Sequence, residues 1–95
     1  MSEKMDVENV SHPGKTYRVD ATKYAAMRKA MMKVLPKDPP GMVVADVIAA
    51  VKPHLPEDVF PGGEKAGWWV KSVQLDLEAK KVIARTPGPV RLYRL

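Results

Sequence analysis

The 95-residue chain contains no cysteine, which excludes a disulfide framework and any metal site built on thiolates. Its two histidines, His12 and His54, lie far apart and each stands beside a proline. No set of His, Asp and Glu therefore has the spacing of a metal site, and no serine lies in a nucleophile motif. We expect a protein that is not an enzyme, with no catalytic, metal or cofactor site.

Long apolar runs are also missing, since no segment approaches the ~18 residues that a membrane-spanning helix needs. The first ten residues, MSEKMDVENV, lack the basic-then-apolar order of a signal peptide. These absences predict a soluble, cytoplasmic protein that does not contact a membrane. A chain of 95 residues is the size of one small domain.

The whole chain has a formal net charge of +5, and most of this positive charge lies in its last third. Residues 64–95 hold seven Lys or Arg against three Asp or Glu, whereas residues 1–63 hold nine against eight. A basic segment of this kind is typical of proteins that contact nucleic acid. It is more often simply the solvated surface of a small soluble protein.

Helical periodicity and end signals predict three helices, over about 20–35, 44–52 and 64–81. Asp20 or Thr22 suits the start of the first helix, and prolines follow the first two. The segments VIART and VRLYRL flank the turn at Pro87-Gly88 and predict a C-terminal hairpin. A short extended pairing is expected at Met42-Val43, just before the second helix.

The N-terminal part differs from the rest. Two short segments that suit strands, VENV and TYRV, flank the turn-forming SHPGK. They predict either an irregular arm or a weak hairpin over residues 7–19, within an N-terminal arm of residues 1–19. The expected fold is mainly α (α+β): an N-terminal arm, then a three-helix domain over 20–95 that ends in a hairpin.

Two resemblances add to this prediction. VKSVQLDLEAKKVIAR, residues 70–85, resembles the third helix and first wing strand of bacterial winged helix-turn-helix regulators, with Lys81 where that pattern usually has glycine. The resemblance implies a winged-helix fold over 20–95. VENVSHPGKTYRVDATKYAAMRKAM and FPGGEKAGWWVKSVQLDLEAK are similar to a family of small uncharacterised bacterial proteins, which implies a bacterial origin and no catalytic residues.

The third predicted helix is apolar on two sides. At about 100° per residue, Ala66, Val70, Val73 and Leu77 form a stripe that should face the core. The opposite side carries Trp68, Ser72, Leu75 and Ala79, and a polar strip that includes Lys71 and Gln74 lies between the two sides. Large apolar side chains read base edges poorly. We therefore expect this side to be covered, by the N-terminal arm or by a second copy of the chain.

Two hypotheses about function follow. In the first, the protein binds double-stranded DNA with weak sequence preference, Ser72 and Gln74 reach base edges, and basic side chains contact phosphates: Lys65, Lys71, Lys81, Arg85, Arg91 and Arg94. In the second, the same scaffold is a protein-interaction or homodimer module without nucleic-acid binding. Its interaction surface would be Trp68, Leu75 and Ala79 on the third helix.

Overall fold

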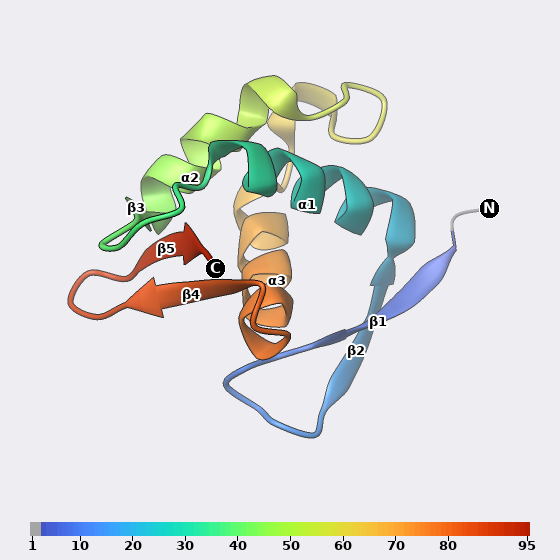
Figure 1. Ribbon diagram of the computed structural model, residues 1–95. Coiled ribbons are helices and arrows are strands. Elements are labelled where there is room, and N and C mark those ends of the chain that lie inside the picture. The colour runs from blue at the N-terminus through green and yellow to red at the C-terminus, as the bar shows by residue number, and fades with distance from the viewer. Residues whose placement is uncertain (1–2) are drawn as a thin grey trace.

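Three α-helices and two small antiparallel sheets make up residues 3–95, the part of the chain that the computed structural model describes (Figure 1). The protein is a small α+β domain, and the three predicted helices and the C-terminal hairpin are confirmed. Within the described residues no helix is long and apolar enough to cross a membrane. In chain order the elements are β1 (Lys4–Glu8), β2 (Thr16–Asp20), α1 (Ala21–Val34), β3 (Met42–Val43), α2 (Val44–Val51), α3 (Ala66–Ala79), β4 (Ile83–Thr86) and β5 (Arg91–Arg94), with 3₁₀ turns at Lys52–His54 and Pro61–Gly63.

Helix α1 begins and ends where local chemistry requires. The Asp20 carboxylate accepts hydrogen bonds from the backbone N–H groups of Thr22 and Lys23, which satisfies two free donors of the first turn. At the other end Leu35 has an extended backbone, the conformation favoured before a proline such as Pro36. The prediction that Asp20 or Thr22 caps this helix is thereby resolved in favour of Asp20.

The three-stranded sheet has the order β3-β5-β4. Met42 pairs with Leu92 in β5, so the expected short pairing before α2 is present. Gly41 makes this pairing possible, because a Cβ atom at its position would lie 2.4 Å from the Leu92 carbonyl oxygen. Its φ of 92° also lies in the region that favours glycine.

Helix α3 is shorter than predicted and starts at Ala66, not Glu64. The backbone before it is left-handed at Gly62, Gly63 and Lys65, which delays the helix by two residues. It ends in a Schellman motif: the N–H of Val82 donates to the Leu77 carbonyl, at 2.9 Å, and the N–H of Lys81 donates to the Glu78 carbonyl, at 3.1 Å. Lys81 therefore takes the left-handed position, with φ of 60°, even though it is not a glycine.

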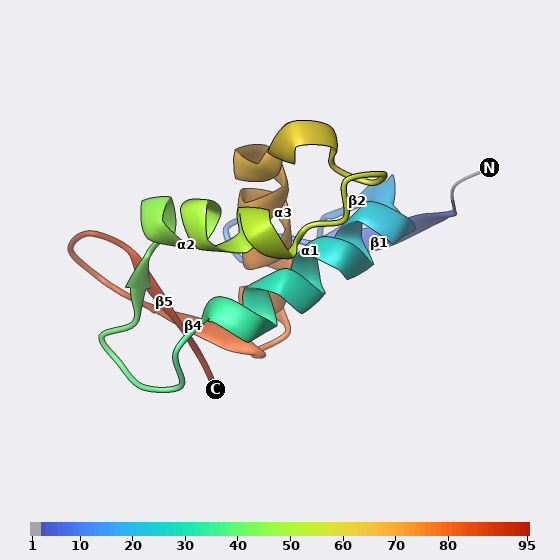
Figure 2. The same cartoon turned by 90° about the horizontal axis from the view of Figure 1, so that it is seen from above.

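The core surrounds α3. Val70, Val73 and Leu77 of the predicted stripe are fully buried, and Ile83 of the hairpin joins them. Phe60, in the loop before α3, is also buried and meets Trp69 edge to face, with ring centroids 6.2 Å apart. Seen from above, the first and last strands lie on opposite sides of α3 (Figure 2).

The N-terminal segment forms a hairpin, which we call the ribbon (β1 and β2), and not an irregular arm. Its strands pair in register from Lys4 with Asp20 to Glu8 with Thr16. Val7 and Val19 lie on the same face of the ribbon and are both buried in the common core. Burial of one apolar face against the helices stabilises a two-stranded hairpin that would be marginal alone.

Replacing Lys81 with glycine is expected to stabilise the protein. A left-handed backbone costs a side-chain-bearing residue ~1–2 kcal/mol, part of which is offset by the freedom of glycine in the unfolded chain, so we expect a net gain of about 1 kcal/mol. Urea unfolding of Lys81→Gly measures it. Lys71→Gly is the matched control. Lys71 lies in the middle of α3 with its side chain exposed, and the same change there should cost about 1 kcal/mol. Equal destabilisation by both changes would contradict the expectation.

Candidate functional site

An apolar groove of about 350 Å³ runs between α3 and the ribbon, and we call it the α3 groove. Two of its aromatic side chains are largely in solvent: Trp68 is 58% exposed and Tyr17 is 46% exposed. Most large apolar side chains of this protein are buried. Two exposed aromatic side chains on the same groove therefore mark a candidate binding surface. The groove is lined by Val7, Glu8, Asn9, Tyr17, Arg18, Val19, Trp68, Ser72 and Leu75.

Two local periodicities build this lining. Trp68, Ser72 and Leu75 are four and three residues apart, so they share one side of α3. On the ribbon, Val7 pairs directly with Tyr17, and paired residues point to the same face of an antiparallel sheet. The groove thus forms where the second apolar side of α3 meets the apolar face of the ribbon.

A second hollow of about 440 Å³ adjoins the groove and is cationic. It shares Arg18, Val19 and Trp68 with the groove. Trp68 therefore stands between an apolar lining on one side and a cationic lining on the other. The second hollow, which we call the basic hollow, is lined by Lys4, Arg18, Val19, Asp20, Lys23, Lys65, Trp68 and Trp69.

Trp68 is held in place by its neighbour. Its ring meets that of Trp69 edge to face, with centroids 5.0 Å apart. Trp69 is buried and in turn packs against Phe60. An exposed aromatic ring that is already oriented loses little conformational freedom when a partner binds, which favours affinity.

The ribbon is fastened to α3 by the buried carboxylate of Asp76. Its Oδ1 accepts a hydrogen bond from the backbone N–H of Glu8 at 2.8 Å, and its Oδ2 accepts one from the Tyr24 hydroxyl of α1. The Lys80 ammonium neutralises the carboxylate from 2.8 Å. The backbone N–H of Val10 adds a bond to the Leu75 carbonyl at 3.3 Å. One side chain thereby joins β1, α1 and α3.

Burial raises the pKa of the Tyr24 hydroxyl well above its usual value, and the hydrogen bond to Asp76 and the charge of that carboxylate raise it further. Tyr24 therefore stays protonated and remains a donor to Asp76. The sequence analysis did not identify this role for Asp76, although one signal was present. An aspartate at position 76 lies next to the core stripe of an amphipathic helix, where a charged side chain requires partners.

The ribbon covers only part of the predicted interaction surface. Leu75 is half-buried beside the ribbon, and Ala79 lines a small hollow under the turn between β1 and β2. Trp68 lies beyond this cover and remains exposed. Of the two covers expected for this side of α3, the N-terminal segment therefore covers Leu75 and Ala79 but not Trp68, because the ribbon contacts α3 toward its C-terminal half, and cover by a second copy of the chain stays a prediction.

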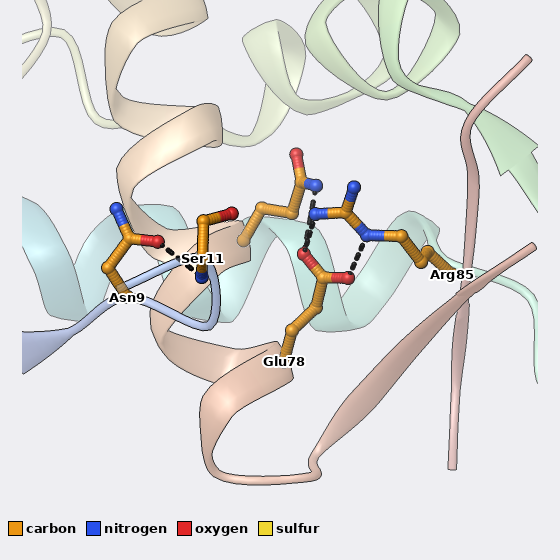
Figure 3. Close-up of polar contacts among 5 residues, drawn as sticks. Asn9, Ser11, Glu78 and Arg85 are labelled. Carbon is orange, nitrogen blue, oxygen red and sulfur yellow. Dashed lines mark hydrogen bonds and ion pairs between the residues drawn. The ribbon is translucent and has the colours of Figure 1, made fainter. Parts of the chain in front are cut away.

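Gln74 does not lie on a surface strip as predicted but is fully buried, so its amide is not accessible at the surface. Its side-chain N–H donates to the Glu78 carboxylate at 3.0 Å. Arg85 of β4 donates two hydrogen bonds to the same carboxylate, at 2.5 and 2.8 Å (Figure 3). Arg85 comes from β4, so a pattern based on α3 alone did not anticipate this network. In the same view, the side-chain oxygen of Asn9 accepts the backbone N–H of Ser11.

The other predicted contacts are spread over the molecule. The Arg94 side chain donates to the Leu35 carbonyl at 2.9 Å, and Arg91 is half-buried on β5. Lys71 and Lys81 are exposed. Lys65 lines the basic hollow, and Ser72 lines the α3 groove. Within residues 3–95 no group of three His, Asp or Glu side chains could hold a metal ion.

Comparison with known protein families identifies the family to which this small α+β protein belongs. The chain belongs to the Family of unknown function (DUF6958), whose model matches residues 4–92. This match includes the ribbon, all three helices, β4 and the first half of β5. No curated protein and no solved structure matches the chain.

Removing the Tyr24 hydroxyl is expected to weaken the attachment of the ribbon. Tyr24→Phe takes one donor from a buried carboxylate, so we expect a loss of about 2 kcal/mol in the free energy of unfolding. Hydrogen exchange at the Glu8 and Val10 amides should accelerate as well. The matched control is Tyr17→Phe, because Tyr17 is exposed and loss of its hydroxyl should change stability little. Equal effects of the two changes would contradict the role of Asp76.

Proposed function

We propose that this protein is a protein-interaction module and that the α3 groove is its binding surface. The observation that carries the proposal is the exposure of Trp68 and Tyr17 on the two walls of one apolar groove. Trp and Tyr dominate the energetic centres of protein interfaces, because they bury much area at a small cost in side-chain entropy. A partner that fills the groove would remove both rings from water.

The scaffold beneath the groove supports this role. We infer that residues 20–95 adopt a winged-helix architecture, on the strength of the element order α1, β3, α2, α3, β4, β5 and of the sheet order β3-β5-β4. In that architecture α3 would be the helix that enters the major groove of DNA. In this chain the ribbon packs along α3 at Leu75 and Asp76. That packing favours a protein partner over a base-reading role for this helix.

Duplex DNA remains a second candidate, favoured by exposed cations outside the groove. Lys65, Lys71 and Lys81 are exposed, and phosphate contacts need only accessible positive charge. Gln74 is buried and Arg85 is paired with Glu78, so base readout has little support. Such binding would be electrostatic, with weak sequence preference.

The groove proposal is tested by capturing partners from the protein's own cells with wild type, Trp68→Ser and Leu95→Ser. Leu95 is the matched control, because it is also an exposed apolar residue, 71% in solvent, and does not line the groove. A captured protein should be lost only with Trp68→Ser. The purified complex should then protect the Tyr17 and Trp68 segments from hydrogen exchange. Partners that bind wild type and Trp68→Ser equally would overturn the proposal.

The DNA candidate is tested by an electrophoretic shift with mixed duplex DNA at ~50 mM salt, which should disappear as salt is raised. Combined replacement of Lys65, Lys71 and Lys81 by Gln should abolish the shift. A control with the same loss of charge replaces Lys29, Lys33 and Lys37, which are exposed on and after α1, and should retain it. No shift with wild type, or equal loss in both variants, would rule this candidate out.

A further inference from the structure

We infer that the partner of the α3 groove is an acidic amphipathic segment of another protein, an inference that rests on the proposed protein-interaction function. The evidence is the position of Trp68 between two linings of different chemistry. The α3 groove on one side is mostly apolar, and the basic hollow on the other side carries four cationic side chains. A ligand that covers Trp68 and both linings needs an apolar part directly beside an anionic part.

The basic hollow has more cations than carboxylates. Asp20, which also caps α1, is the carboxylate among its lining, against four cationic side chains, and Glu8 lines the α3 groove. Arg18 lies 3.9 Å from Asp6, but both side chains are mostly in solvent, and exposed pairs of this kind contribute little. The hollow thus presents a net positive charge to an incoming carboxylate through Lys4, Arg18, Lys65 and the half-buried Lys23, whose ammonium also lies over the Phe60 ring.

A second copy of the chain fits this surface poorly. A symmetric dimer would bury the same patch of both subunits in one interface, so two hollows of net positive charge would share that interface. Like charges brought together in this way cost free energy at an interface. With an acidic partner the electrostatic interaction across the interface is attractive instead of repulsive. Electrostatic complementarity therefore favours an acidic partner over self-association.

The apolar part of the groove suits an apolar partner better than nucleic-acid bases. The groove is lined by the aliphatic side chains of Val7, Val19 and Leu75 and by two aromatic rings, beside the polar side chains of Glu8, Asn9, Arg18 and Ser72. Base edges are read by hydrogen bonds, which the aliphatic part of this lining does not offer. Leucine or aromatic anchors of an amphipathic segment match an aliphatic lining, because their binding requires burial and no directed hydrogen bonds.

The inference is tested with labelled synthetic peptides and the purified full chain, using fluorescence anisotropy. The first peptide is an amphipathic helix former with Leu and Trp on one face and Glu on the other. Its neutral twin carries Gln in place of Glu, and an oligothymidine of similar size is the third probe. We expect the acidic peptide to bind at least about tenfold more tightly than its neutral twin, with the affinity falling as salt is raised.

Two variants locate the binding. Trp68→Ser should weaken the acidic peptide by about tenfold or more. The combined change Lys4→Gln, Arg18→Gln, Lys65→Gln should do the same, and should bring the acidic peptide to the affinity of the neutral twin. The combined change Lys29→Gln, Lys33→Gln, Lys37→Gln removes equal charge away from the groove and should have little effect. Circular dichroism and urea unfolding of every variant show that the fold is retained.

Each other outcome overturns the inference in a distinguishable way. Equal binding of the acidic peptide and its neutral twin, both lost with Trp68→Ser, would leave the groove as a protein-binding site but remove its preference for acidic partners. The same holds if neither peptide binds while Trp68→Ser still loses a native partner. Tighter binding of oligothymidine would assign the surface to nucleic acid. Self-association in sedimentation that Trp68→Ser abolishes would assign it to a second copy of the chain.

Discussion

The fully buried carboxylate of Asp76 is the constraint on which the arrangement of this protein depends. An ionised group without contact to water is tolerated only with close partners, and Asp76 takes one from each neighbouring element: the Glu8 amide of β1, the Tyr24 hydroxyl of α1 and the Lys80 ammonium after α3. The carboxylate is fully paired only when β1, α1 and α3 all lie in their native positions. The two-stranded ribbon, which has one buried face, is thereby held at a defined place on α3.

The position of the ribbon decides what the second apolar side of α3 can do. Because the ribbon is attached at Leu75 and Asp76, it covers the C-terminal half of that side and leaves Trp68 at the open end. The result is a groove instead of a closed core. Packing of Trp68 against the buried Trp69 keeps the exposed ring oriented, and the cations of β1, β2 and α1 lie next to it. The attachment of the ribbon to α3 thus both stabilises the fold and leaves the groove open at Trp68.

Local chemistry made much of the fold predictable. Capping by Asp20, the prolines after α1 and near the end of α2, and the alternation around Pro87-Gly88 act over a few residues, so they are legible in sequence. The start of α3 was misplaced because Lys65 takes a left-handed conformation that few side-chain-bearing residues adopt. The burial of Gln74 was missed for another reason: burial depends on how other elements pack on α3, and the Glu78 carboxylate that accepts from Gln74 is also bound by Arg85 of β4.

By itself, the sequence determined which side chains share a side of each helix, since helical periodicity depends only on residue spacing. It therefore identified Val70, Val73 and Leu77 as core and recognised a second apolar side at Trp68 and Leu75. Only the tertiary structure decided how that second side is used. The ribbon reaches Leu75 from more than sixty positions earlier in the chain, and the Asp76 carboxylate joins elements that are distant in sequence. Such contacts depend on where chain segments meet in space, and no spacing along the chain records that.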